Sequence, residues 1–157
     1  MIITKITTID DPMRPEQTKA EILADVRDMT QKHRDLFVTL LKQSIQTEDT
    51  VGSCLYAAFM CSTALGKFTK AQITIRGGDG EGDGGLFVDD VGHGHYWLEA
   101  DIQGDKFIVD ITADQFGLPP VIVERIEVMA QIYVPGDQQV VNDHVLEMMK
   151  EIAQGGQ

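Results

Sequence analysis

The 157-residue sequence predicts one α+β domain over residues 1–157, because its length suits a single core and its two halves follow different hydrophobic patterns. Apolar residues in the first half recur at steps of three and four, which is typical of amphipathic helices. Short runs in the second half alternate apolar and polar residues between glycines, which is typical of strands. Helices followed by strands in this order predict an antiparallel sheet with helices packed on it.

Two helices are expected before the sheet. Residues 2–9 alternate loosely and predict a short first strand, which Asp10-Asp11-Pro12 would end. Helical spacing then runs from residue 15 to about residue 45, where Pro15 suits a first turn. A second helix is expected over residues 53–68. It is apolar on most sides, which predicts burial on most sides, and Gly66 is its expected C-terminal cap.

The second half is expected to hold the strands and a closing helix. The expected strands are residues 71–76, 86–88, 95–102, 106–111 and 126–134. The third and fourth flank Gln103-Gly104-Asp105, and a turn containing glycine between two alternating runs predicts a hairpin. The glycine- and acid-rich stretch 77–85 is expected to be a loop. Residues 138–153 carry apolar residues at helical steps and predict a final helix.

The charge of the chain argues against nucleic acid and membranes as partners. The 13 basic and 25 acidic residues give a formal net charge of −12, and the basic residues are scattered. Such a surface repels phosphate backbones and anionic lipid headgroups. No apolar run approaches the ~18 residues that would span a bilayer. The acidic surface suits solubility or a basic partner, and the sequence indicates no particular oligomeric state.

The two cysteines and the first residues predict a cytoplasmic protein. Cys54 and Cys61 lie in the expected second helix, about 10 Å apart along its axis. That separation exceeds the ~7 Å limit between the Cα atoms of a disulfide, and unpaired thiols suggest a reducing compartment. The N-terminus also lacks the charged region and long apolar region of a signal peptide.

Cys54 is the expected nucleophile, because it opens the second helix directly after Gly52-Ser53. Unpaired amide hydrogens at a helix N-terminus favour a thiolate and can hold the oxyanion of a tetrahedral intermediate. Gly52 leaves room for a substrate backbone and Ser53 is expected to cap the helix, so both are assigned to the substrate-binding site. A free cysteine is more often a small buried hydrophobic residue. We interpret Cys61 in that way, and for Cys54 alone the same alternative stays open.

His95 is the expected base among the four histidines. His33 and His144 lie in expected helices and are interpreted as structural or solvent-facing, whereas His95 begins an expected strand after a glycine-rich loop. Residues two apart in a strand share a face, so Trp97 is expected beside His95, where it would shield a hydrogen bond of the ring from water. Trp97 is also assigned to the substrate-binding set. Without partners, His95 would be an ordinary loop histidine.

Asp110 is the expected third member of a triad. It ends the apolar run Phe107-Ile108-Val109, where a carboxylate is costly unless it has a partner. The hairpin would bring it level with the strand that begins at His95, where it can fix the tautomer of the ring and stabilise the imidazolium. The alternative is that Asp110 only caps the following turn through hydrogen bonds to the backbone.

These motifs together resemble the transglutaminase-like branch of the papain-fold enzymes. The likeness is carried by Gly52-Ser53-Cys54, His95-Tyr96-Trp97-Leu98-Glu99 and Val109-Asp110-Ile111-Thr112. The chain is also similar to the uncharacterised bacterial YunG-like family, through residues 92–97 and 110–116. The resemblance covers about residues 50–117 and implies a papain/transglutaminase-like fold with a Cys54, His95 and Asp110 triad. It implies no substrate. Glu48 stands about where papain has a glutamine, which leaves the second oxyanion donor unassigned.

The expected activity is thiol acyl transfer on an amide bond, with no cofactor. Attack by Cys54 on the carbonyl would leave a thioester, while His95 protonates the departing amine. Water would then give a cysteine protease, amidase or glutamine deamidase, which we favour, and an amine would give a transglutaminase. A protein or peptide substrate is expected. The alternative function is a non-catalytic acidic module that binds or inhibits a basic partner.

Two groups of residues could hold a metal ion, and we favour neither as a metal site. Asp79, Glu81 and Asp83, with Gly84 sixth and Asp90 twelfth, resemble a calcium loop, but the flanks predict strands instead of helices. We interpret this stretch as a solvated flexible loop, with a flap over the cleft or a contact for a cationic substrate group as a second possibility. His93 and His95 with Asp90 lack the fourth ligand of a closed zinc site.

Overall fold

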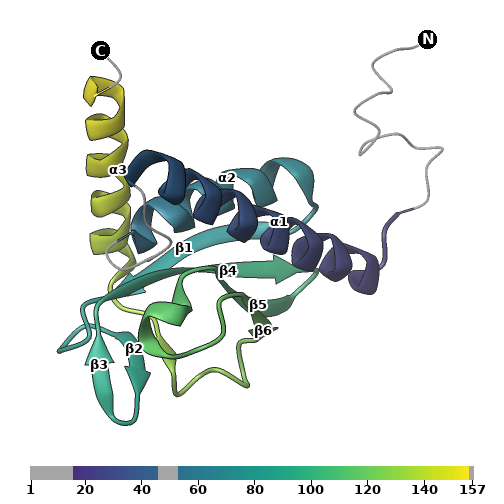
Figure 1. Cartoon of the computed structure of the whole chain (residues 1–157). Helices are drawn as coiled ribbons and strands as arrows, with labels where there is room; N and C mark the ends of the chain where they lie inside the picture. The colour runs from purple at the N-terminus through teal and green to yellow at the C-terminus, as the bar shows by residue number, and fades with distance from the viewer. Residues whose placement is uncertain (1–15, 46–52, 156–157) are drawn as a thin grey trace.

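The structure is a computed structural model that describes residues 16–45 and 53–155, and within these ranges it is an α+β protein (Figure 1). The helices are α1 (Lys19–Ile45), α2 (Cys54–Phe68) and α3 (Gln138–Gly155), with a short 3₁₀ helix η2 (Ala113–Phe116). The strands are β1 (Gln72–Gly78), β2 (Gly85–Val88), β3 (Val91–His93), β4 (His95–Ile102), β5 (Asp105–Asp110), β6 (Ile122–Arg125) and β7 (Tyr133–Val134). The expected strand over residues 2–9 lies outside the described residues.

The main sheet is antiparallel, with its four strands in the order β1-β4-β5-β6. At its centre, β4 and β5 form the expected hairpin, in which Ile102 pairs with Asp105. The two residues between them, Gln103 and Gly104, have φ values of 53° and 95°. Two left-handed residues in a two-residue loop match the twist of the strands, so this turn fixes the hairpin register.

The remaining strands form a second sheet in the order β3-β2-β7. Here two sequence predictions were wrong. We did not anticipate β3, and the expected strand 126–134 is mostly a series of turns that ends in the two residues of β7. Backbone hydrogen bonds from Val128 to Arg125 and from Met129 to Ile126 close these turns, and Val128 is 64% exposed. The alternation of apolar and polar residues over this stretch therefore does not reflect burial on one face of a sheet.

The boundaries of the first two helices differ slightly from the predictions, for local reasons. Thr18 and Glu21 form a reciprocal capping box, in which each side chain accepts a hydrogen bond from the backbone N–H of the other residue. Helix α1 therefore begins at Lys19, a turn after Pro15. Gly66 does not cap α2, which continues to Phe68. Instead, the Thr69 hydroxyl and amide both donate to the Leu65 carbonyl and end the helix.

The main sheet has a hydrophobic core on each face. Helices α1 and α2 cover one face (Figure 1), where α2 buries Ala57, Cys61 and Leu65 against Leu98 and Val109 of the central strands. On the other face, a second core packs around Trp97, Ile108 and Tyr133, drawn from β4, β5 and β7. Alternate residues of β4 and β5 thus serve opposite cores.

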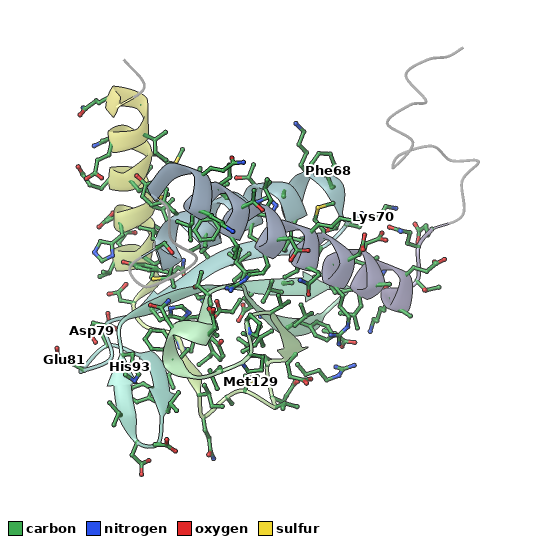
Figure 2. The ribbon with its side chains drawn as sticks, in the orientation of Figure 1. Phe68, Lys70, Asp79, Glu81, His93 and Met129 are labelled. Carbon is green, nitrogen blue, oxygen red and sulfur yellow. The ribbon has the colours of Figure 1, made fainter. Side chains whose placement is uncertain are left out.

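Helix α3 contacts β1 and stands at one end of the sheet (Figure 1). Figure 2 shows Asp79 and Glu81, on the loop from β1 to β2, far from Phe68 and Lys70 at the end of α2. The start of α2 is therefore directed toward the end of the molecule that holds this loop and α3. Among the described helices, none combines the length and apolar character needed to cross a bilayer.

Candidate active site

Cys54, His95 and Asp110 each stand at the end of a regular element. Cys54 is the first residue of α2, His95 the first of β4, and Asp110 the last of β5. The hairpin register pairs Leu98 with Val109, which places Asp110 one residue beyond the last pair and on the strand next to His95. His95 Nε2 and Asp110 Oδ2 are 2.7 Å apart, and the two side chains are 0% and 2% exposed. The sequence-predicted base and carboxylate are therefore a buried hydrogen-bonded pair.

Asp110 accepts hydrogen bonds from three further donors. Its Oδ1 accepts the Thr112 backbone N–H at 2.9 Å and the Thr112 hydroxyl at 3.3 Å. Its Oδ2 accepts the Tyr133 hydroxyl at 2.7 Å in addition to the His95 ring. Asp110 thus has both of the roles considered for it, because one carboxylate oxygen caps the following turn and the other bonds to His95.

Tyr133 is the member of this cluster that sequence reasoning missed. It lies in β7, is 2% exposed, and is 23 residues from Asp110 in the sequence. Burial, together with the charge and hydrogen bond of Asp110, raises the pKa of Tyr133 well above its ordinary value, so its hydroxyl remains a donor. The only signal in the sequence was a tyrosine at the end of an apolar run, since a buried tyrosine hydroxyl needs a partner.

Replacing Tyr133 by phenylalanine is expected to lower the free energy of unfolding by about 1–3 kcal/mol, because it removes a buried hydrogen bond to a charged group and leaves the ring in place. Urea denaturation at pH 7 measures the change. Tyr56→Phe is the matched control, since Tyr56 is 46% exposed, and it is expected to have little effect. Equal stability of the Tyr133→Phe protein and the unmodified protein would contradict the role assigned to this hydroxyl.

Aromatic rings enclose the imidazole of His95. Trp97 stacks beside it at 6.2 Å between ring centroids, and Phe116 meets it edge-on at 5.0 Å. Trp97 also packs against Tyr133 at 5.1 Å. Trp97 is 1% exposed, so it leaves almost no surface for a substrate, and its assignment to the substrate-binding set is not supported. Its contacts are those of a side chain that keeps water from the His95–Asp110 hydrogen bond.

Besides Asp110, Cys54 also acts on the ring of His95. Nδ1 is buried and forms no hydrogen bond of full geometry with the described residues. Cys54 nonetheless lies close enough to act on the ring. Burial lowers the pKa of His95, but the charge and hydrogen bond of Asp110, together with those of Cys54, outweigh it and raise the pKa to about 9. Loose contacts of this kind are common in unliganded active sites.

The two cysteines occupy different environments. Cys54 is partly exposed at the start of α2, whereas Cys61 is 1% exposed in the core below the helix. Burial and the charge of Asp110 raise the pKa of Cys61 to about 12, so it stays a neutral thiol. The interpretation of Cys61 as a core residue is confirmed, and both cysteines are free.

Of the other residues near the expected oxyanion site, Ser53 and Gln43 lie within the described part of the chain. Gly52, Glu48 and Gln46 lie outside the described residues. Ser53 occupies the N-cap position of α2, as expected, and its carbonyl accepts the Ala57 N–H, but its side chain makes no capping hydrogen bond. Gln43, a glutamine further back in the chain than Glu48, is exposed on α1.

The acidic loop is packed against its neighbours and is not the loose chain we expected. Asp79 Oδ1 accepts the backbone N–H groups of Glu81 and Asp83 at 2.8 and 3.0 Å. A Cβ atom on Gly80 would lie 2.5 Å from the backbone of His93, so only glycine permits this approach. Within the described residues, no group of three or more His, Cys, Asp or Glu side chains is arranged to hold a metal ion.

Two cavities lie on either side of a contact between β4 and α3, in which Tyr96 Oη pairs with His144 Nδ1. The first, of about 440 Å³, is lined by Gly94 and Tyr96 and by residues of the acidic loop and the start of α3. The second, of about 390 Å³, is lined by Leu55, Tyr56 and residues of α3. Cys54, His95 and Asp110 line neither cavity, but Tyr96 lines both, and burial together with the charge of Cys54 raises the pKa of Tyr96.

Comparisons with protein-family models, with curated proteins and with solved structures found no match to this chain.

Proposed function

We propose that the protein is a thiol acyl-transfer enzyme with Cys54 as nucleophile, His95 as base and acid, and Asp110 as the residue that orients His95. The observation that carries the proposal is the buried 2.7 Å pair between His95 and Asp110, near a cysteine that begins a helix and helps to raise the pKa of His95. Covalent acyl transfer requires a nucleophile close to a base, and a base that is held in place by a carboxylate.

The reaction begins with attack of the Cys54 thiolate on the carbonyl carbon of an amide. Negative charge moves to the carbonyl oxygen, which backbone N–H groups at the start of α2 can stabilise. The C–N bond then breaks, the amine leaves with a proton from His95 Nδ1, and a thioester remains on Cys54. Water attacks the thioester while His95 takes its proton, and the C–S bond breaks to release the acid and restore the thiolate beside a protonated His95.

Asp110 would hold His95 through this cycle. Its bond to Nε2 keeps a proton on that nitrogen and leaves Nδ1 to exchange a proton with sulfur or substrate. Because Thr112 and Tyr133 also donate to it, the carboxylate cannot turn away when the ring changes charge. Asp110 therefore acts through His95 and need not touch the substrate.

The fold and the setting are part of the same proposal. A helix that begins with the cysteine, packed on an antiparallel sheet whose adjacent strands carry the histidine and the carboxylate, supports a papain/transglutaminase-like fold. Water is the favoured acceptor, which makes the enzyme a protease, amidase or glutamine deamidase, and a transglutaminase is the alternative. Two free thiols, one of them partly exposed, support a cytoplasmic location.

Site-selective alkylation tests the chemistry without a known substrate. Iodoacetamide at pH 7 is expected to modify Cys54 at least about tenfold faster than a free model thiol, since a neighbouring imidazolium favours the thiolate. Cys61 is expected to stay unmodified in the folded protein. Peptide mapping by mass spectrometry after timed quenching gives both rates. His95→Gln should bring the rate at Cys54 down to that of the model thiol.

The matched control for this experiment is His93→Gln, because His93 lies two residues from His95 and contacts Phe116 but has no part in the proposed pair. That variant should keep the fast rate. A Cys54 that reacts no faster than the model thiol, or equally fast in the His95→Gln protein, would contradict the proposed enzyme and leave an acidic binding module as the better interpretation.

A further inference from the structure

We propose that the substrate of this site is a peptide segment carrying lysine or arginine side chains, and that the cavity between α3 and the β1–β2 loop binds one of them. The inference rests on the proposed function, because it names the substrate class of the same site. It is drawn from the position of the two cavities, from their walls, and from the charges at their rims.

The walls of the two cavities include chain neighbours of His95 and Cys54. The larger one reaches Gly94 and Tyr96, on both sides of His95, and the smaller one reaches Leu55, next to Cys54. Tyr96 lines both cavities, and the charge of Cys54 is one of the causes that raise the pKa of Tyr96, so the proposed nucleophile lies near both. A peptide bound across both cavities would therefore pass the reacting groups.

The larger cavity combines apolar walls with an acidic rim. Tyr96, Val140 and Val141 form apolar wall surface. Asp79, Asp83 and Asp137 supply three carboxylates to the same cavity, and no lysine or arginine lines it among the described residues. Long basic side chains pack their methylene stems on apolar surface and place the charged group at its edge. Their donors also make the strongest hydrogen bonds with carboxylates.

Backbone amides hold these carboxylates in position. Asp83 Oδ1 accepts the Asp137 N–H at 2.8 Å, and Asp137 Oδ1 accepts the Gln139 N–H at 2.9 Å. Asp79 Oδ1 accepts two amides of its own loop, and those hydrogen bonds lower the pKa of Asp79. No lysine or arginine in the described part of the chain forms an ion pair with any of the three. The cavity therefore presents fixed negative charge that nothing described there neutralises.

The smaller cavity extends this acidic lining beyond the Tyr96–His144 contact. Glu147 and Glu151 of α3 line it together with Tyr56, Met148 and His144, again without a lysine or arginine among the described residues. A substrate with basic residues on both sides of the reacting amide would match both cavities. The formal net charge of −12 would also speed the approach of such a peptide and slow that of an acidic one.

Binding to the full-length Cys54→Ala protein tests the inference without turnover. The probes are short fluorescein-labelled peptides with blocked ends, alternating alanine with arginine or alanine with glutamate, and the readout is fluorescence anisotropy. We expect only the arginine peptide to bind, and more weakly as salt is added. In the double variant Asp79→Asn/Asp137→Asn its Kd should rise at least about fivefold. Asparagine keeps the oxygens that accept the backbone amides, so the loop should keep its shape.

The control is the double variant Asp89→Asn/Asp90→Asn. It removes the same charge from the exposed turn between β2 and β3, where both residues have positive φ values that asparagine tolerates. Its Kd should change less than about twofold. Equal effects of the two double variants, or equal binding of the glutamate peptide, would overturn the inference. Fast alkylation of Cys54 with charge-independent binding would leave the proposed enzyme intact. Charge-dependent binding with an inert Cys54 would instead contradict the chemistry.

Discussion

Replacing Asp110 by asparagine is expected to lower the free energy of unfolding at pH 7 by about 3–5 kcal/mol, the usual cost of removing one member of a buried ion pair. The carboxylate accepts from four donors: the His95 ring, the Tyr133 hydroxyl, and the amide and hydroxyl of Thr112. An asparagine side chain has one acceptor oxygen and an NH₂ group that only donates. Whichever way it turns, its NH₂ group faces buried donors.

The same substitution is expected to slow alkylation of Cys54 by at least about tenfold, because an unanchored imidazole loses the tautomer that serves the sulfur. Urea denaturation and timed alkylation measure the two effects. Asp101→Asn on β4 is the matched control, since asparagine there can still accept the Gly104 N–H, and both quantities should stay near those of the unmodified protein. An Asp110→Asn protein as stable and as reactive as the parent would remove the basis for the triad.

Raising the pH from 6 to 9 is expected to destabilise the protein by up to about 3 kcal/mol through His95. Its pKa is about 9 in the folded protein, against an ordinary value of 6.5. Between these values the folded chain binds one proton more than the unfolded chain. The stabilisation is therefore complete below pH 6.5 and is lost as the pH rises through 9. Urea denaturation at several pH values gives the slope.

Two variants separate the causes of this pH dependence. In Asp110→Asn the slope between pH 6.5 and 9 should largely vanish, because the charge that most strongly raises the pKa of His95 is gone. In Cys54→Ala most of the slope should remain, since Cys54 makes the smaller contribution. Cys61 is the same in all three proteins, so its own ionisation above pH 8.5 on unfolding cancels in the comparison. Identical slopes for the unmodified and Asp110→Asn proteins would refute the assignment.

The hairpin and its two polar residues could be predicted from sequence because local rules determine them. The turn at Gln103-Gly104 and the alternation on both sides give the register, and the register alone brings Asp110 next to the strand that begins at His95. The burial of Trp97 was harder to predict from the sequence. Alternation places it on the face of His95, but which face is covered, and by what, depends on η2 and β7.

Tyr133 and the acidic loop were beyond local rules for another reason. Tyr133 reaches Asp110 only because a chain of turns from Ile126 to Ile132 returns it to β2, and such turns carry little hydrophobic pattern. The glycines of the acidic loop suggested a flexible chain. They instead allow backbone to pack on backbone, as Gly84 does against Val134 and Gly136. Composition alone does not distinguish these two uses of glycine.

The tight turn between β4 and β5 also bears on how the molecule assembles. The imidazole and its carboxylate are separated by only 15 residues, so the loss of chain entropy on bringing them together is small. The Cys54 thiol and the Tyr133 hydroxyl are separated from this pair by longer stretches of chain. Contacts across longer stretches form later in folding. A nascent or partly unfolded chain would thus hold an oriented ring with no thiol beside it. The proposed reactivity toward amides would arise only at the last stage, when the helix docks and the sheet is complete.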